Sequence, residues 1–423
     1  MLRFLTAGES HGPCLIGIIE GMPAGLRLDV ARINADLTRR QVGFGAGGRM
    51  KIEKDEVEVL AGIGWNGPGK GLTTGGPIAL RIENRDWVNW QHKTPPLFSV
   101  PRPGHADLAG GIKYGHLYDM RLVLERASAR ETAMRVAIGG VARQFLGEFG
   151  IQIGSYVTQI GPLRARIPDL PYPEVFALAE SNDIRCPDLD QVDAMREYIR
   201  DTIKRRDTVG GVFEVIALGV PSGLGSHVHW DRKLDGRLAQ AMMSVPAVKG
   251  VEIGPAFDNA ARYGTEIHDE IVLSDGHVTR PTNRAGGTEG GITTGQPIVV
   301  RAALKPIATT LNPMRSVDLA TGEETTTNYE RSDFTAVTRG SPIGEAVVAW
   351  VLAEALVEKL GGDSLAEMRP RFAQIAAELL HKSVGEEPGH DRLTDGAAAR
   401  HGRKVRPFVV RLSLLAADQV HRP

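Results

Sequence analysis

Two histidines stand in glycine-rich segments where an imidazole could exchange protons. His11 lies in the segment Gly8-Glu-Ser-His-Gly12, and His105 is followed two residues later by Asp107. Imidazole titrates near neutral pH, so either ring could act as a general acid or base. The plainer alternative for both is a loop histidine that bonds to backbone, and Asp107 could orient the His105 ring or merely solvate it.

A third segment combines arginines with the start of a helix. Ser128-Ala-Arg-Glu131 is a capping box that predicts a helix N-terminus at Ser128. Arg126 would precede this helix and Arg130 would lie in its first turn, where each cation opposes the helix dipole by roughly 0.3–1 kcal/mol. Neighbouring glutamates could compensate. Alternatively, backbone N–H groups and both guanidinium groups could hold an anion there.

Gly139 and Gly140 fall inside the same predicted helix. Each glycine costs a helix roughly 1 kcal/mol relative to alanine. The pair therefore indicates that another element, or a cofactor, packs closely against that face.

Two more basic segments could bind anions. Arg39 and Arg40 end a predicted helix, where cations suit the dipole anyway, and the glycine-rich loop 43–49 that follows could wrap an anion. Farther along, Arg331 and Asp333 are two residues apart and would point to the same side of an extended segment. Arg331 could then hold Asp333 in its ionised form, which would place a base beside a cation.

Composition narrows the class of protein. The 423 residues carry 50 basic and 51 acidic side chains, which argues against a nucleic-acid-binding protein. Only Cys14 and Cys186 are present, without CxxC spacing, so neither a disulfide framework nor a metal site is predicted. We see no secretory signal and no membrane-spanning apolar run, and therefore expect a cytoplasmic protein with no membrane partner.

Strand-like and helical patterns alternate along the chain, which predicts a mixed α/β fold of the α+β type. Strands are predicted at residues 15–20, 57–63, 77–82, 212–220 and 297–304. Helices are predicted at residues 30–40, 129–145, 191–205, 231–243, 342–360 and 365–379. The helix over 342–360 has Ser341 as its predicted N-cap and is apolar around most of its circumference, so it should be buried on several sides.

An internal duplication is visible in the sequence. Gly71–Ile82 and Gly291–Ala302 are identical at seven of twelve positions, and Gly21–Leu26 matches Gly219–Leu224. Chance similarity of short glycine-rich turns is the alternative. Matching order and spacing favour one domain over residues 1–380 with pseudo-twofold symmetry, in halves of about 1–200 and 201–380. Residues 381–423 are expected to form a mobile tail.

At these segments the chain closely resembles the chorismate synthase family. The matching stretches run in the family's order over roughly residues 1–366. They are Ala7–Gly12, Arg102–Asp107, Glu125–Thr132, Val248–Gly254, Asn283–Gly287, Gly290–Gln296, Lys305-Pro306 and Arg331–Asp333. The resemblance implies a β/α/β sandwich, distinct from a Rossmann fold, that assembles as a homotetramer.

The resemblance also implies a reaction. It is the anti-1,4-elimination of phosphate from 5-enolpyruvylshikimate 3-phosphate, which carries one phosphate and two carboxylates, to give chorismate. Reduced FMN would be required without net redox change. NADPH would serve only to reduce the flavin, and a separate flavin reductase could be a partner.

Site roles follow from the same resemblance. His11 would be the general acid near the leaving phosphate, His105 would protonate or polarise the reduced flavin, and Asp333 would take the C6 proton together with flavin N5. The implied substrate-binding residues are Ser10, His11, Arg40, Arg49, Arg102, Arg130 and Arg331. The implied flavin-binding residues are His105, Arg126, Ala127, Ser128, Pro246, Ala247, Gly290, Lys305, Pro306, Ile307, Ala308, Thr309 and Arg331.

One position departs from the family, and two other functions compete. Where many members carry an arginine in the first anion loop, this chain has Ala46, so either Arg40 and Arg49 make that contact or substrate binding is weaker.

An NADPH-dependent flavin reductase is the nearest enzymatic rival, although no GxGxxG motif follows a strand. A non-catalytic flavin- or phosphate-binding protein would explain the arginines but would not need the two histidines.

Overall fold

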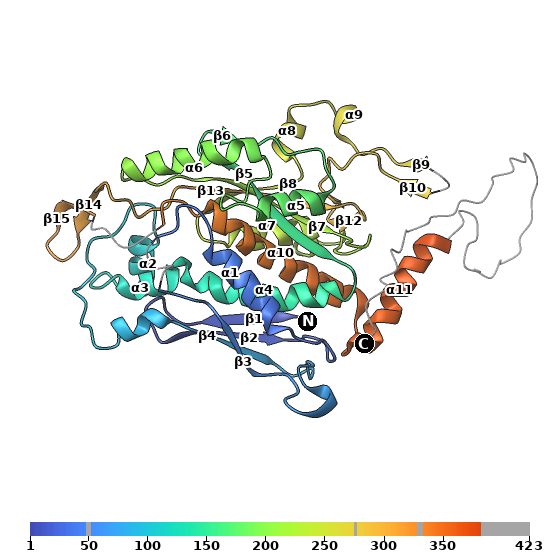
Figure 1. The fold of residues 1–423 in the computed structure, drawn as a ribbon, viewed down its shortest axis with the longest axis horizontal. Helices are drawn as coiled ribbons and strands as arrows, with labels where there is room; N and C mark the ends of the chain where they lie inside the picture. Colours follow the sequence, from blue (N-terminus) through green and yellow to red (C-terminus); the bar gives the residue numbers. More distant parts are fainter. Residues whose placement is uncertain (48–51, 275–276, 328–332, 382–423) are drawn as a thin grey trace, which may run out of the picture.

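Two antiparallel sheets enclose a layer of helices (Figure 1). The computed structural model describes residues 1–47, 52–274, 277–327 and 333–381. The first sheet has the order β1 (Arg3–Ala7), β2 (Cys14–Glu20), β4 (Ile78–Glu83), β3 (Val57–Ala61). The second has the order β6 (Leu163–Arg164), β5 (Gln152–Ile160), β7 (Gly211–Leu218), β13 (Ile298–Leu304), β8 (Val248–Ile253). This β/α/β layering matches the mixed α/β fold expected from the sequence.

Four helices fill the layer between the sheets: α1 (Val30–Gln41), α4 (Thr132–Gly147), α7 (Leu234–Met243) and α10 (Val337–Leu360). The other helices and helical turns lie around this frame. They are η2 (Gly67–Gly69), η3 (Arg85–Asn89), α2 (Asp107–Tyr114), α3 (Arg121–Ala127), η4 (Ala129–Glu131), α5 (Tyr172–Glu180), α6 (Leu189–Lys204), η5 (Trp230–Arg232), α8 (Ala256–Ala260), α9 (Gly264–Ile267) and α11 (Leu365–His381). The remaining short strands are β9 (Val272–Ser274), β10 (His277–Thr279), β11 (Thr288–Glu289), β12 (Ile292–Thr293), β14 (Arg315–Asp318) and β15 (Glu323–Thr326).

The sequence patterns located most of the central elements. All five predicted strands are present with small shifts at their ends, whereas β1, β5 and β8 were not predicted. The predicted cap of α1 is confirmed, since the Asp29 carboxylate accepts hydrogen bonds from the backbone N–H groups of Ala31 and Arg32.

The predicted start of α10 was wrong. The helix begins at Val337, so Pro342 lies inside it and Ser341 is not its N-cap. Proline removes the backbone N–H that would bond to the Thr338 carbonyl. The Ser341 hydroxyl lies 3.4 Å from that carbonyl oxygen and donates to it instead, which helps the helix to continue through the proline.

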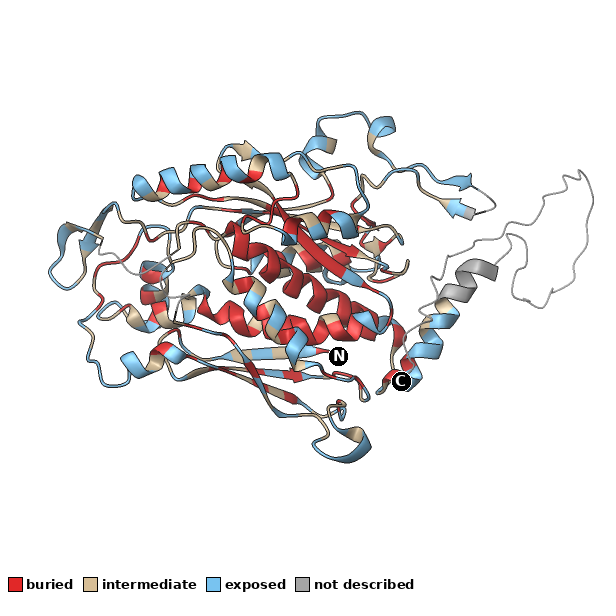
Figure 2. Ribbon diagram, in the orientation of Figure 1, coloured by how far each residue is buried: buried red, intermediate tan, exposed pale blue. Residues whose placement is uncertain are grey.

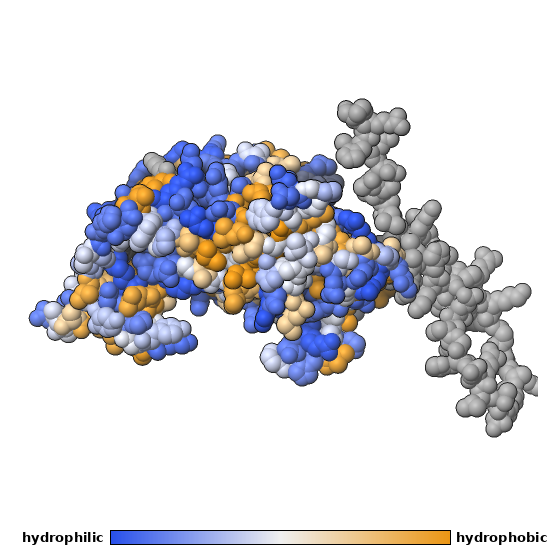
Figure 3. All heavy atoms as spheres, turned by 90° about the horizontal axis from the view of Figure 1, so that it is seen from below, coloured by the Kyte–Doolittle hydropathy of each residue, from blue (hydrophilic) through white to orange (hydrophobic). Residues whose placement is uncertain are grey.

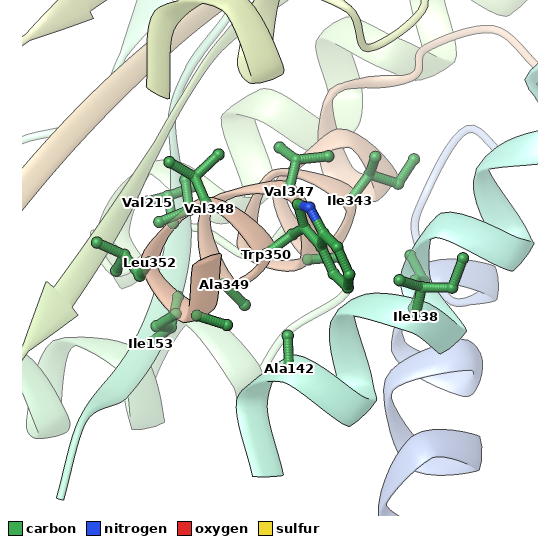
Figure 4. Close-up of a cluster of buried hydrophobic side chains, with 14 of the residues drawn as sticks. Ile138, Ala142, Ile153, Val215, Ile343, Val347, Val348, Ala349, Trp350 and Leu352 are labelled. Atoms are coloured by element: carbon green, nitrogen blue, oxygen red, sulfur yellow. The ribbon is translucent and has the colours of Figure 1, made fainter. Parts of the chain in front are cut away.

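Helix α10 is buried around almost its whole circumference, as its composition predicted (Figure 2). Its side chains Val347, Val348, Trp350 and Leu352 pack with side chains from α4 and from the second sheet (Figure 4). Among the described helices, α10 is also the one long and apolar enough to cross a membrane, but 94% of its most apolar window is buried inside the protein. Its apolar character is therefore that of a core helix.

The two glycines of α4 mark close helix crossings. A Cβ atom on Gly139 would lie 2.5 Å from the Cα of Ala346 and 2.8 Å from its carbonyl oxygen, both in α10. A Cβ atom on Gly140 would lie 3.3 Å from side-chain atoms of Ile33 in α1. The expectation that another element packs against this face is confirmed, and that element is a pair of helices.

We predict that Gly139→Ala destabilises the protein although alanine favours helix by roughly 1 kcal/mol. The new methyl group must push α4 away from α10, and overpacking of this kind costs about 1–3 kcal/mol or more. Thermal unfolding should show a lower Tm. Gly147→Ala is the matched control because no atom lies within 4 Å of the added methyl in the same helix. Equal Tm values for the two variants would contradict the close crossing.

Candidate active site

The loop between β1 and β2 holds His11 against helix α3. The backbone N–H of His11 donates to Glu125 Oε2 at 2.7 Å, and the ring Nδ1 lies 2.8 Å from Glu125 Oε1. The backbone N–H of Ser10 donates to the Glu125 carbonyl at 2.9 Å. The Trp90 ring packs on the imidazole with 4.0 Å between ring centroids. His11 is therefore held by one carboxylate and one aromatic face.

Glu125 is a functional candidate that the sequence reasoning missed. Burial raises the pKa of this carboxyl, but hydrogen bonds from the His11 ring and backbone outweigh burial and leave the pKa below its usual value. The carboxylate is consequently ionised at neutral pH beside the imidazole. The signal available in the sequence was its place in the Glu125–Thr132 stretch, where it was considered only as a compensating charge.

Arg126 precedes the helical turn that starts after Ser128, as predicted, but it also belongs to a helix that was not predicted. Helix α3 runs to Ala127, so Arg126 lies in its last turn, where a cation suits the dipole. Its guanidinium donates to the carbonyls of Thr6 and Gly8. The next turn, η4, begins after Ser128, whose hydroxyl oxygen accepts from the Arg130 N–H.

The predicted N-cap at Ser128 is confirmed, whereas the reciprocal bond of Glu131 is not seen in the described part of the chain. The Ser128 hydroxyl caps a 3-10 turn and accepts the hydroxyl hydrogen of Ser10 at 3.1 Å. Glu131 makes an ion pair with Arg135 at 2.8 Å. A short turn between α3 and α4 replaces the single helix start that the motif suggested, because the chain changes direction there.

Arg130 and Arg40 share one buried carboxylate. Arg130 makes an ion pair with Asp55, and Arg40 Nη2 donates to the other oxygen of the same carboxylate at 2.7 Å. Arg130 Nε also donates to Asn84 Oδ1 at 2.8 Å, and the Glu53 carboxylate lies 3.6 Å from its Nη2. Arg40 and Arg130, two of the predicted substrate-binding arginines, thus meet at the Asp55 carboxylate. Neither Asp55 nor Asn84 was predicted as a site residue.

Burial makes this charged group sensitive to ligands. Burial lowers the pKa of Arg40 to about 10, with Asp55 opposing the shift and Arg339 and Arg130 adding to it. The pKa of Asp55 lies below its usual value because the two arginines outweigh its burial. Arg40 Nε is buried and has no hydrogen-bond acceptor in the described part of the chain. An anion that offered an acceptor here would relieve the cost of that N–H group.

Asp333 is linked to Arg40 through Arg339. Its Oδ1 accepts from the Gly47 N–H at 2.7 Å, and its Oδ2 makes an ion pair with Arg339 in the first turn of α10. Arg339 Nε donates to the Arg40 carbonyl at 3.0 Å. The cation seen beside Asp333 is therefore Arg339, which was not predicted.

Two of the predicted anion-binding residues cannot be placed. Arg49 and Arg331 both lie outside the described residues. The expected pairing of Arg331 with Asp333 thus stays a prediction, and Arg339 supplies a cation in either case.

A second histidine group forms around a fully buried carboxylate. Asp107 accepts from Arg102 Nε at 2.8 Å and from its backbone N–H at 3.1 Å, and His105 Nδ1 lies 2.5 Å from Asp107 Oδ1. Arg102 also donates to the Thr309 hydroxyl at 3.2 Å. Burial raises the pKa of Asp107, but hydrogen bonds from His105 and Arg102 outweigh it and hold the pKa far below its usual value. Asp107 therefore orients the ring, the first of the two alternatives.

The segment 305–309 joins this second group. The Lys305 ammonium donates to the Gly104 carbonyl, and the Lys305 N–H donates to the Ala247 carbonyl at 2.9 Å. Ala247 has a φ of 71°, in the left-handed region that a non-glycine residue rarely adopts. Strain of this kind is concentrated at functional sites, which agrees with the flavin-binding role implied for this loop.

Among the residues that the structure describes, no hydrogen bond joins the other predicted flavin-binding residues to either histidine, and Gly290 has no described contact with either histidine group. A Cβ atom on Gly104 would lie 3.7 Å from the Ala308 side chain, and the Ile307 carbonyl accepts from the Thr208 hydroxyl. Pro306 lies between Lys305 and Ile307, Pro246 immediately precedes Ala247, and Ala127 ends α3. Gly290 lies in the turn between β11 and β12 and has open space where a Cβ atom would be.

Aromatic rings connect the two histidine groups. The Arg121 guanidinium lies 5.9 Å from the ring centroids of both Trp90 and Phe98. Trp90 packs on His11, and the Arg102 guanidinium lies 5.4 Å from the Phe98 ring. The two histidines thus belong to one continuous region.

A polar chain connects the His11 loop to Asp333. Asn84 Nδ2 donates to the carbonyls of Glu9 and Gly12, and its Oδ1 accepts from Arg130. From Arg130 the chain continues through Asp55, Arg40 and Arg339 to Asp333. Six segments that are distant in the sequence therefore build one site.

Histidines held by carboxylates, buried arginines and an ion-paired aspartate are groups with which α/β enzymes bind anions and transfer protons. The sequence model of the chorismate synthase family matches residues 2–357. A chorismate synthase of Aquifex aeolicus is 52% identical over 391 residues, which cover 88% of this chain and 96% of that protein. The chain belongs to the chorismate synthase family, whose members are carbon–oxygen lyases.

A second relative and a solved structure point to the same family. A chorismate synthase of Geobacter sulfurreducens is 50% identical over 389 residues, which cover 88% of this chain and 98% of that protein. A crystal structure of a chorismate synthase superposes with a TM-score of 0.73 at 44% identity and covers 89% of this chain and 98% of that chain. The family therefore accounts for almost all of the described fold.

We predict that Asp55→Asn makes the stability of the protein depend on phosphate. Removing the shared carboxylate takes the counter-charge from Arg40 and leaves Arg130 with the more distant Glu53 carboxylate, and breaking a buried pair in this way costs about 3–5 kcal/mol. Inorganic phosphate should restore part of the lost stability, since a ligand that binds the native state stabilises it. In thermal unfolding, Asp55→Asn should have a lower Tm and a larger increase in Tm on adding phosphate than the unchanged protein.

Asp36→Asn is the matched control for this experiment. Asp36 also binds two arginines, Arg39 and Arg143, but lies outside the polar chain that ends at Asp333. Its phosphate response should equal that of the unchanged protein. If Asp55→Asn responded no more strongly than Asp36→Asn, the arginines around Asp55 would not form an anion site.

Proposed function

We propose that this chain eliminates phosphate from 5-enolpyruvylshikimate 3-phosphate to give chorismate. The observation that carries the proposal is the polar chain from the His11 loop through Arg130, Asp55 and Arg40 to Asp333. It brings an acid candidate, buried guanidinium groups and a base candidate into one region. A substrate with one phosphate and two carboxylates needs this combination, because both ends of the elimination involve protons and all its charges are negative.

The roles of the side chains follow from what each one contacts. Arg40, Arg130 and Arg102 would bind the phosphate and carboxylates, with Ser10, Arg49 and Arg331 completing the set. His11 would give a proton to the leaving phosphate, and Asp333, which makes an ion pair with Arg339, would accept the C6 proton. General acid and base groups of this kind typically contribute about 10²–10⁴-fold each.

Reduced FMN is the proposed cofactor, and the residues near His105 suit it. Reduced FMN supplies electron density while phosphate leaves, with no net redox change. Lys305, Arg102 and His105 form a set of N–H donors around Gly104 that suits an anionic ring system and a phosphate tail. His105 would donate its proton to the flavin side of the site, while the 246–247 and 305–309 segments, with Arg126, Ala127, Ser128 and Gly290, would hold it in place.

Several finer features belong to the same proposal. The protein would act in the cytoplasm, with NADPH needed only to reduce the flavin, either through an added reductase activity of this chain or through a separate enzyme. A homotetramer is supported by exposed apolar side chains on the outer face of the first sheet (Figure 3). Leu5 and Ile18 lie opposite each other in the β1–β2 pair, and Ile18 lies opposite Ala79 in the β2–β4 pair.

We also propose that the fold is an internal duplication. Thr73 Oγ1 accepts from the Leu26 N–H and donates to the Pro23 carbonyl, and Thr293 Oγ1 does the same with Leu224 and Pro221. The order β1-β2-α1-β3-β4-α4 is matched by β5-β7-α7-β8-β13-α10. This order supports a division between α4 and β5 rather than near residue 200. The antiparallel pairing in both sheets supports a sandwich over a Rossmann fold.

We predict that the purified protein releases phosphate from 5-enolpyruvylshikimate 3-phosphate under anaerobic conditions with chemically reduced FMN. Chorismate absorbance should rise together with free phosphate. Oxidised FMN alone should give no product, and NADPH should support turnover only where it reduces the flavin. Flavin reduction by NADPH without chorismate formation would favour the reductase, whereas binding of FMN and phosphate without either reaction would favour the non-catalytic alternative.

We predict that Asp333→Asn lowers turnover by at least about 10²-fold, because the amide cannot accept a proton from carbon. The Asn oxygen can still accept the Gly47 N–H, so reduced FMN and substrate should still bind. The Arg339 side chain is buried but Asp333 is partly exposed, so the Tm should fall less than in Asp55→Asn. Near-normal turnover would exclude Asp333 as the base, and a large fall in Tm together with lost activity would make the pair structural.

A further inference from the structure

Each of the two histidines contacts a carboxylate through the same ring atom. His11 Nδ1 lies 2.8 Å from Glu125, and His105 Nδ1 lies 2.5 Å from Asp107. The two carboxylates come from different segments, since Glu125 is 114 residues from His11 whereas Asp107 is two residues from His105. The same arrangement has therefore been built twice from unrelated parts of the chain.

In both cases a backbone N–H fixes the carboxylate. Glu125 Oε2 accepts from the His11 N–H, which leaves Oε1 for the ring. Asp107 Oδ2 accepts from the Arg102 N–H and Nε, which leaves Oδ1 for the His105 ring. A backbone N–H can only donate, so neither carboxylate can turn away from its ring without losing a hydrogen bond.

The contact between Arg102 Nη2 and His105 Nδ1 at 3.1 Å does not change this assignment. If Arg102 donated to an unprotonated Nδ1, the lone pair of that nitrogen would face Asp107 Oδ1 at 2.5 Å, and two acceptors would repel each other. A proton on Nδ1 turns this short contact into a charge-assisted hydrogen bond. Both the ring and Arg102 then donate to Asp107.

We propose that Glu125 and Asp107 are positioning residues that hold a proton on Nδ1 of each histidine, so that both rings exchange protons at Nε2. This inference rests on the proposed function for its catalytic meaning. In the elimination, the His11 imidazolium gives its Nε2 proton to the leaving phosphate oxygen. The ring becomes neutral, keeps its Nδ1 proton on Glu125, and the carboxylate stays ionised throughout.

The groups that surround each ring are consistent with this state. Around His11 lie Glu125 and Arg121 from α3, the Trp90 ring and the Ser10 backbone. Around His105 lie Asp107, Arg102 and, through the Gly104 carbonyl, Lys305. Among the residues that the structure describes, each ring thus faces a carboxylate through Nδ1, and the cation next to that carboxylate helps to keep it ionised.

Glu125→Gln separates this proposal from a merely structural role. An amide has one acceptor end and one donor end. The backbone N–H of His11 requires the acceptor, so the amide NH2 must face Nδ1, which then has to become an acceptor. The neutral His11 ring should therefore change tautomer and carry its proton on Nε2. A general reason to expect lost activity is that a wrong tautomer disables a proton-transferring histidine even when the geometry is kept.

The measurement is the ¹⁵N spectrum of the histidine ring nitrogens in full-length protein without substrate or flavin, at a pH where the rings are neutral. In the unchanged protein, His11 and His105 should both carry the proton on Nδ1. In Glu125→Gln, the His11 spectrum should show an unprotonated Nδ1 and a protonated Nε2. The His105 signals should stay as they are in the unchanged protein. Asp107→Asn should give the reverse result, by the same reasoning about its Arg102 N–H.

Glu131→Gln is the matched control. Glu131 is also a buried glutamate, but it pairs with Arg135 and contacts neither ring. This variant should keep both tautomers. With substrate and reduced FMN, Glu125→Gln should lower kcat by at least about 10²-fold with a smaller change in KM, because the defect concerns proton transfer rather than binding.

Three results would overturn the inference. One is a His11 ring that carries its proton on Nε2 in the unchanged protein, and another is a Glu125→Gln variant with unaltered ring signals. The third is a changed tautomer with normal kcat. The first two do not depend on which reaction the protein catalyses, so they test the tautomers even if the proposed function itself were to fail.

Discussion

The contact between α4 and α10 is the constraint on which the rest of the structure depends. Gly139 leaves no side chain between the helices, so the α10 backbone at Ala346 lies directly against α4. Both helices carry site arginines at their N-terminal ends, Arg130 just before α4 and Arg339 in the first turn of α10. A wider crossing would move these two guanidinium groups apart and would separate Asp55 from Asp333. A packing constraint in the core thus fixes the geometry of a charged site.

Burial of many charges near that crossing is possible because the arginines there pair with buried carboxylates, which they share. Arg39 and Arg40 are consecutive in α1 but face opposite sides, Arg39 toward Glu345 and Arg40 toward Asp55. Burial raises the pKa of Glu345, but Arg39, Arg143 and Arg185 outweigh it and lower the pKa to about 2. An unpaired charge at either position would cost several kcal/mol. The Glu345 group therefore anchors the end of α1 and leaves Arg40 directed toward the site.

The sequence predicted the parts of the fold and site that depend on local patterns. Periodicity located α1, α4 and the central strands, the glycine pair at 139–140 indicated a close crossing, and family motifs indicated His11 and His105. The sequence patterns did not indicate Glu125, Asp55, Asn84 and Arg339 as site residues. Each of them contacts a residue that is far away in the chain. Glu125 is 114 residues from His11, and Arg339 contacts a carbonyl 299 residues away. No spacing rule relates such positions before the helices are packed.

The two connections that start at the His11 loop, one to Asp333 and one to His105, differ in strength. From the His11 loop to Asp333 the connection runs through buried ion pairs and hydrogen bonds, which are costly to break. From His11 to His105 it runs through Trp90, Arg121 and Phe98, and contacts of a cation with an aromatic face are worth only about 0.5–2 kcal/mol. The part of the site around Arg130 and Arg40, proposed to bind substrate, is therefore held by the stronger contacts. The part proposed to hold the flavin is joined to it by weaker ones, and each histidine keeps a carboxylate partner of its own.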